Sequence, residues 1–183
     1  GPAVVTVSAA AAESGVTDSS CTNTGTAEPA SDDVVPDANQ YKYQKDELAA
    51  FCHFGPNTFN EIEWGEHYGD KKPSEIFRLN QKFDAETMVS TLKSAGFKKL
   101  IITAKHHDGF CIWPSEYTDY DAEAAGYKGD ILEEISTACT KHGMDMGLYL
   151  SPWDIHEPSY GYKDANGNPT TPDKDVKDYN EYY

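Results

Sequence analysis

The stretch GDILEEISTACTKHGMDMGLYL, residues 129–150, combines the signals of a helix with those of a buried strand. Asp130 is suited to cap the first turn, with Glu133 three residues later, and apolar side chains then recur at helical spacing. Gly143 suits the left-handed position that ends a helix. The apolar run 144–150 follows at once. The stretch therefore predicts a helix that leads directly into a strand.

The same order of signals occurs earlier in the chain. Residues 83–97, FDAETMVSTLKSAGF, have a capping aspartate, Asp84, near their start and a glycine, Gly96, near their end, and the apolar run KKLIITA, residues 98–104, follows them. A further apolar run, LAAFCHF, covers residues 48–54. Strands that alternate with helices in this way form βαβ units with parallel strands, so the predicted fold class is α/β. No G-x-G-x-x-G motif follows a strand, which favours a (β/α)8 TIM-like barrel over a doubly wound dinucleotide fold.

The chain divides into two parts by composition. Residues 1–40 are rich in Ala, Ser, Thr, Asp and Pro and lack a sustained apolar period, which predicts a disordered or linker lead. Residues 41–183 carry the three apolar runs and both helical patterns. Because a complete barrel takes about 250 residues, we expect residues 41–183 to form the first three βα units of a truncated barrel.

The charge balance restricts the ligands that the chain can attract. Asp and Glu number 31 and Lys and Arg 15, so the formal net charge is −16, which would repel a nucleic-acid backbone or an anionic membrane surface. No apolar stretch approaches the ~20 residues of a membrane-spanning helix. Three of the four cysteines lie in or beside apolar runs and no C-x-x-C occurs, so we expect reduced thiols. A neutral ligand such as a glycan suits this composition best.

Unusual residues follow all three predicted strands, at the sheet edge where ligands bind in parallel folds. His53 ends the first strand, His106 and His107 end the second, and SPWD, residues 151–154, follows the third. Neighbouring residues of a regular strand point to opposite faces, so both histidines can face one pocket only if the strand breaks there. The turn residues Asp108 and Gly109 favour such a break.

Two kinds of site fit these residues. The histidines and Asp108 could ligate a metal, but an adjacent pair does not present both imidazoles on one face as H-x-H does. Imidazoles that bind sugar hydroxyls explain the same residues, and loop tryptophans beside carboxylates are typical of carbohydrate pockets. Glycoside hydrolysis generally uses two carboxylates, and spacing alone indicates Glu63, Asp108 and Asp154 as candidates.

Longer strings then point to one family. HFGPNTFNEIEWGE, LKSAGFKKLIITAKHHDGFCIWPSEYTDYD, GDILEEISTACTKHGMDMGLYLSPWD and DYNEYY resemble the N-terminal part of the catalytic domain of glycoside hydrolase family 29, the α-L-fucosidases. The most specific element is HHDGF after an apolar strand. HFGPNTF together with YLSPWD resembles the subgroup that prefers α-1,3/1,4-linked fucose.

The resemblance implies a (β/α)8-like catalytic domain and retaining hydrolysis of terminal α-1,3/1,4-linked L-fucose through a covalent fucosyl-enzyme intermediate, without a metal or cofactor. It assigns substrate binding, by motif match, to His53, Glu63, Trp64, His106, His107, Tyr149 and Trp153. The family's nucleophile is an aspartate at the end of the fourth strand and its acid/base a later glutamate, and both positions fall after Tyr183. We therefore assign no catalytic residue in this chain, withdraw Asp108 and Asp154 as a catalytic pair, and expect the fragment alone to be inactive.

The resemblance also implies partners. These would be fucosylated glycans of the Lewis type and the remainder of the catalytic domain, with no nucleic acid and no membrane span, in a secreted or extracytoplasmic setting. Two alternatives stay open from the residues alone. One is a metal-dependent barrel hydrolase, and the other is a non-catalytic fucose-binding module.

Overall fold

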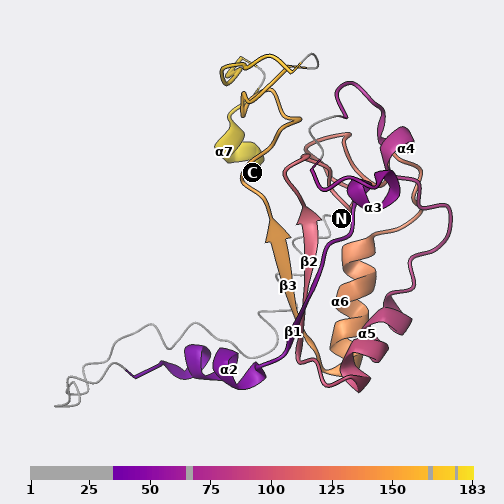
Figure 1. Cartoon of the computed structure of the whole chain (residues 1–183), viewed down its shortest axis with the longest axis vertical. Helices are drawn as coiled ribbons and strands as arrows, with labels where there is room; N and C mark the ends of the chain where they lie inside the picture. The colour runs from indigo at the N-terminus through magenta and orange to yellow at the C-terminus, as the bar shows by residue number, and fades with distance from the viewer. Residues whose placement is uncertain (1–34, 65–67, 165–166, 176) are drawn as a thin grey trace.

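The structure is a computed structural model that describes residues 35–64, 68–164, 167–175 and 177–183 (Figure 1). Its elements are, in order, α2 (Ala38–Asp46), β1 (Ala49–Cys52), α3 (Pro56–Asn60), α4 (Pro73–Ile76), α5 (Ala85–Ser94), β2 (Lys99–Lys105), α6 (Ile131–His142), β3 (Asp145–Leu150) and α7 (Tyr179–Tyr182). Most of the predicted lead, residues 1–40, lies outside the described residues, and its last three residues begin α2.

The strands form one parallel sheet in the order β1-β2-β3. Ala49 pairs with Lys99, and Lys99 pairs in turn with Asp145, so the three strands start in line. The predicted α/β class with parallel strands is confirmed. Closure of the sheet into a barrel is not seen among the described residues and stays a prediction.

Both predicted helices begin and end at the expected signals. The Asp84 side chain accepts a hydrogen bond from the backbone N–H of Thr87 at the start of α5, and Asp130 accepts one from Leu132 at the start of α6. Gly143 takes a φ of 60° directly after α6. That left-handed conformation costs glycine little, so the helix stops there and β3 follows after one residue.

Helices α5 and α6 cover one face of the sheet (Figure 1). The core between them contains Leu100 and Ile102 from β2, Val89 from α5 and Ile135 from α6, and none of these four side chains is exposed. Each such burial contributes about 1.5–3 kcal/mol. On β1, Phe51 stays 49% exposed. Within the described residues, the sheet thus has one covered face and one open face.

A bulge interrupts the pairing of β2 with β3 near their carboxyl ends. The register passes from Thr103–Tyr149 to Lys105–Leu150, so Ala104 is an extra residue in β2. The strand then ends at Lys105, and the backbone N–H of Gly109 donates a 3.0 Å hydrogen bond to the carbonyl of His106. The strand break predicted from the HHDG sequence is therefore present.

Three further observations concern other parts of the chain. Cys52, Cys111 and Cys139 are free thiols, as expected, whereas Cys21 lies outside the described residues. Near the end of the chain, the four residues of α7 form a short helix. Over the described part of the chain, no helix has both the length and the apolar character needed to cross a membrane.

Candidate functional site

The rings of the predicted binding residues meet at the carboxyl ends of the three strands. The ring centroid of His106 lies 5.5 Å from that of His53 and 4.3 Å from that of His107. The His107 ring in turn lies 4.7 Å from that of Trp153. Residues that follow three different strands therefore form one continuous layer of rings.

Trp64 and Tyr149 complete this layer. The Trp64 ring lies 5.1 Å from that of His107 and 5.4 Å from that of Trp153, and the side chain is 39% exposed. Tyr149, within β3, stacks on His106 at 5.8 Å. We call the six residues the ring cluster: His53, Trp64, His106, His107, Tyr149 and Trp153. Its exposed tryptophan offers an apolar surface to a ligand.

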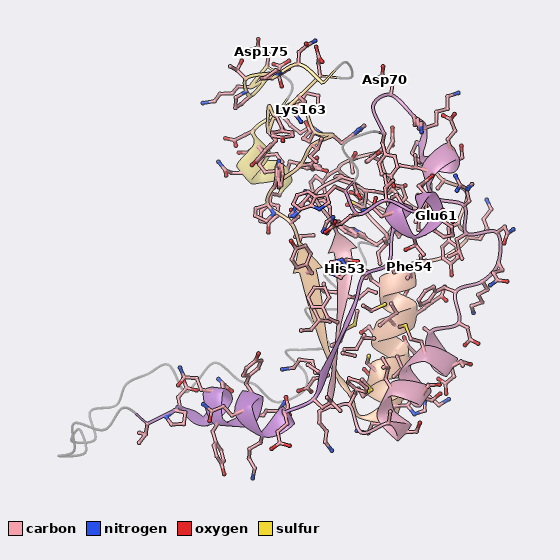
Figure 2. The ribbon with its side chains drawn as sticks, viewed as in Figure 1. His53, Phe54, Glu61, Asp70, Lys163 and Asp175 are labelled. Carbon is pink, nitrogen blue, oxygen red and sulfur yellow. The ribbon has the colours of Figure 1, made fainter. Side chains whose placement is uncertain are left out.

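Glu63 lies beside the ring cluster. It is exposed and lines a pocket of about 450 Å³ together with His53 and His106. The pocket is fixed in place at the end of β1, where Figure 2 shows His53 and Phe54. The backbone N–H and carbonyl of Phe54 both bond the Thr103 hydroxyl at 3.0 Å, which ties this end of β1 to β2. All seven residues assigned from the resemblance thus lie at one edge of the sheet.

Burial favours the neutral form of the two adjacent histidines. It lowers the pKa of His106 to about 4, and the charges of His107 and His53 act in the same direction. Burial also lowers the pKa of His107. Nδ1 of His106 is buried and has no hydrogen-bond partner among the described residues. A neutral imidazole has one donor and one acceptor nitrogen, which suits a ligand hydroxyl.

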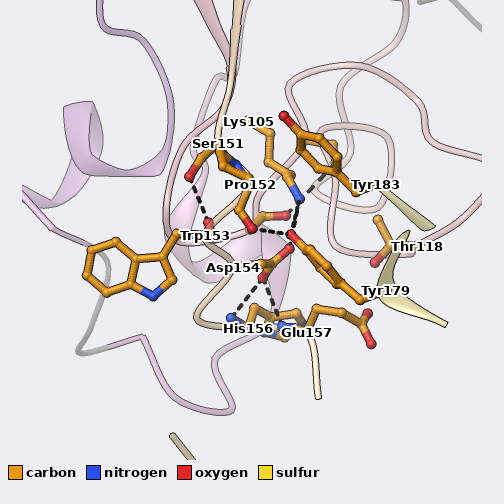
Figure 3. Close-up of polar contacts among 12 residues, drawn as sticks. Lys105, Thr118, Ser151, Pro152, Trp153, Asp154, His156, Glu157, Tyr179 and Tyr183 are labelled. Carbon is orange, nitrogen blue, oxygen red and sulfur yellow. Dashed lines mark hydrogen bonds and ion pairs between the residues drawn. The ribbon is translucent and has the colours of Figure 1, made fainter. Parts of the chain in front are cut away.

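A buried ion pair lies beside the ring cluster (Figure 3). The Lys105 ammonium is 3.0 Å from the Asp154 carboxylate, and the two side chains are 4% and 1% exposed. The other carboxylate oxygen of Asp154 accepts hydrogen bonds from the backbone N–H groups of His156 and Glu157. The carboxylate therefore holds the loop that carries Trp153 against the end of β2.

Aromatic rings of the C-terminal segment cover this ion pair. The Lys105 ammonium lies 5.5 Å from the ring centre of Tyr179, 5.0 Å from that of Tyr182 and 5.4 Å from that of Tyr183. The Tyr179 hydroxyl donates a 2.8 Å hydrogen bond to the carbonyl of Pro152. Sequence reasoning missed Lys105. The available signal was a lysine directly after a continuous apolar run, where its charge needs a buried partner.

Among the described residues, Asp108 has no oppositely charged partner of this kind. One carboxylate oxygen accepts a 2.9 Å hydrogen bond from the N–H of Phe110, while the other has no partner among the described residues. Burial raises the pKa of Asp108 to about 7, and the charge of Asp154 adds to this shift, whereas the Phe110 N–H and Lys105 oppose it. Asp108 is thus a buried carboxyl group with a raised pKa, whereas Asp154 is a carboxylate paired with Lys105. Among the described residues, no three His, Cys, Asp or Glu side chains converge in a way that could hold a metal ion.

Comparison with known proteins places the chain in a family. The sequence model of the family described as alpha-L-fucosidase matches residues 16–183. The chain belongs to the α-L-fucosidase family. Alpha-L-fucosidase 1 of Arabidopsis thaliana is 42% identical to it over 152 residues, which are 81% of this chain and 27% of that protein.

Solved α-L-fucosidases share the fold as well. A Ruminococcus gnavus GH29 fucosidase in complex with fucose is 76% identical, with a TM-score of 0.75 over 87% of this chain and 33% of that one. A GH29 α-L-fucosidase of Bacteroides thetaiotaomicron, trapped as a covalent intermediate with 2-fluoro-fucosyl fluoride, is 32% identical, with a TM-score of 0.60 over 76% of this chain and 35% of that one. The chain spans about a quarter to a third of the length of these α-L-fucosidases.

Proposed function

We propose that this chain supplies the fucose-binding part of a retaining α-L-fucosidase that releases terminal α-1,3/1,4-linked L-fucose from Lewis-type glycans. The observation that carries the proposal is the ring cluster, in which residues after three parallel strands meet beside the Glu63 pocket. The family membership and the fucose complex of the Ruminococcus gnavus enzyme support the sugar.

Each part of the site suits a deoxy sugar. Neutral His106 and His107 exchange hydrogen bonds with hydroxyls without the desolvation cost of an imidazolium. The Glu63 carboxylate accepts hydrogen bonds from further hydroxyls. The exposed surface of Trp64 packs against the C–H face and the methyl group of fucose. Together these groups fix the orientation of one hexose ring at the strand ends.

The chemistry itself requires residues beyond this chain. Retention of configuration needs a carboxylate nucleophile and a second carboxyl group about 5–5.5 Å away, and we assign both to the remainder of the catalytic domain, which would also close the sheet into a (β/α)8 barrel. The covalent intermediate of the Bacteroides thetaiotaomicron enzyme supports this mechanism. We further propose a secreted or extracytoplasmic enzyme, where fucosylated glycans are accessible.

The test uses the full-length protein that contains this chain. It is incubated with a Lewis trisaccharide, with an α-1,2-fucosylated trisaccharide as the control, and the released sugar is followed by ¹H NMR. We expect L-fucose from the Lewis substrate, faster than from the control, with the α-anomer appearing first. Initial β-anomer would exclude retention, and equal rates would exclude the linkage preference. Fucose binding without release would instead favour a non-catalytic module, and loss of activity on chelation a metal-dependent hydrolase.

A further inference from the structure

A buried serine lies directly behind the ring cluster. Ser151 follows β3, is 0% exposed, and donates its backbone N–H to the carbonyl of Lys105 at 2.9 Å. Its hydroxyl lies 2.6 Å from Nδ1 of His107 and 2.8 Å from the carbonyl oxygen of Trp153 (the latter contact is drawn in Figure 3). The hydroxyl thus bridges two residues of the ring cluster.

The chemistry of the two contacts fixes the direction of both hydrogen bonds. A carbonyl oxygen can only accept, so the single hydroxyl proton of Ser151 is donated to Trp153. The hydroxyl oxygen must then accept the other hydrogen bond, and Nδ1 of His107 must carry a proton to donate. In the neutral ring, this leaves Nε2 unprotonated.

The free nitrogen is available to a ligand. Within the part of the chain that the structure describes, Nε2 of His107 forms no hydrogen bond. The ring lies between those of Trp64 and Trp153, at 5.1 and 4.7 Å. An unprotonated nitrogen in this position accepts a hydrogen bond and cannot donate one.

We propose that Ser151 is a positioning residue that holds His107 in the Nδ1–H tautomer, so that Nε2 selects a hydroxyl donor on the bound sugar. The inference rests on the proposed function and deepens it. His106 differs, because no described residue bonds its buried Nδ1 and its tautomer is left to the ligand. Of the two adjacent histidines, one therefore has a fixed hydrogen-bonding direction and the other an adaptable one.

The first test reads the tautomer directly. The full-length protein is labelled with ¹⁵N-histidine, and the His107 signals are assigned by their loss in His107→Gln. We expect a protonated Nδ1 and an unprotonated Nε2 in the parent protein, and a shift towards Nε2–H in Ser151→Ala. Protonated Nε2 in the parent protein, or an unchanged tautomer in Ser151→Ala, would overturn the proposal. The spectrum of the parent protein alone shows which nitrogen of His107 is protonated, even if Ser151→Ala does not fold.

The second test reads the consequence for the substrate. Ser151→Ala should raise KM for the Lewis trisaccharide about tenfold, as for one lost hydrogen bond, with a smaller change in kcat, and Ser151→Thr should restore KM by keeping the hydroxyl. Ser159→Ala is the matched control, since Ser159 is also buried but its hydroxyl bonds, among the described residues, only Glu157. An active parent protein with equal KM in Ser151→Ala overturns the inference alone, whereas an inactive parent protein overturns the proposed function and leaves the tautomer test intact.

Discussion

The ammonium group of Lys105 lies 3.0 Å from the carboxylate of Asp154, and the two side chains are almost completely buried. Lys105 is the last residue of β2, and Asp154 belongs to the loop after β3. The backbone N–H of Ile155, in the same loop, donates a 2.8 Å hydrogen bond to the carbonyl of His107. The ion pair is thus one of several contacts that fix the two site-forming loops to each other.

Breaking the ion pair should destabilise the protein strongly. Lys105→Met leaves the Asp154 carboxylate buried without its counter-charge, so we expect the free energy of unfolding to fall by about 3–5 kcal/mol. Urea unfolding of the full-length protein measures the change. Lys141→Met is the control, because it removes an exposed ion pair with Glu86 and should cost less than about 1 kcal/mol. Equal losses in the two variants would contradict the role of the buried pair.

Position 109 requires a glycine because Asp154 lies too close for a larger side chain. Its φ is 79°, and a Cβ atom there would lie 2.3 Å from a carboxylate oxygen of Asp154. Gly126 has a φ of 100°, but a Cβ atom there would meet nothing within 4 Å, so Gly126→Ala carries the backbone strain alone. We expect Gly109→Ala to lower Tm clearly more than Gly126→Ala in thermal unfolding. Similar Tm values would show that the contact with Asp154 relaxes without cost.

The raised pKa of Asp108 should make the stability of the protein depend on pH. Its folded pKa of about 7 lies above the ordinary value of 3.8, so between these values the folded state holds a proton that the unfolded state has lost. Stability should therefore decrease as pH rises from about 4 to about 7. Asp108→Asn, which keeps the acceptor for the Phe110 N–H, should remove this part of the pH profile and be more stable than the parent protein at pH 8. The midpoints of urea unfolding across this pH range measure the effect. Profiles that run parallel in the parent protein and Asp108→Asn would contradict the shifted pKa.

Trp64 should contribute to ligand binding more than to folding. It is 39% exposed and packs against the rings of His107 and Trp153. We expect Trp64→Ala to raise KM for the Lewis trisaccharide by roughly one order of magnitude, as the loss of ring packing would, with Tm nearly unchanged. Tyr41→Ala on α2 removes an aromatic ring that is 53% exposed and should leave KM unchanged. A parent-like KM in Trp64→Ala would separate this residue from the sugar site.

The elements that were predictable are those with local, periodic signals. The sequence predicted all three strands, the capping aspartates of α5 and α6, and the break after Lys105, because each depends on residues within a few positions of one another. It also led to the ring cluster, since the carboxyl ends of parallel strands share one edge.

Long-range pairing was not predictable in the same way. Lys105 and Asp154 are 49 residues apart, and neither has a local pattern that names its partner. The role of Ser151 was not predictable from the sequence either. A hydroxyl donates or accepts a hydrogen bond according to the groups that packing brings to it. The short helices α3 and α4 lack a sustained period, so their start was not evident from the apolar pattern.

The bulge at Ala104 makes the length of β2 as important as its composition. Side chains alternate between faces along a strand, so one extra residue reverses the face on which the next strand residue, Lys105, lies. Deleting Ala104 would therefore move the buried ammonium group of Lys105 to the other face of β2 relative to Tyr149. Point substitutions on the open face of the sheet do not change this alternation of side chains. The carboxyl-end edge of the sheet should therefore tolerate substitutions far better than insertions or deletions in β2.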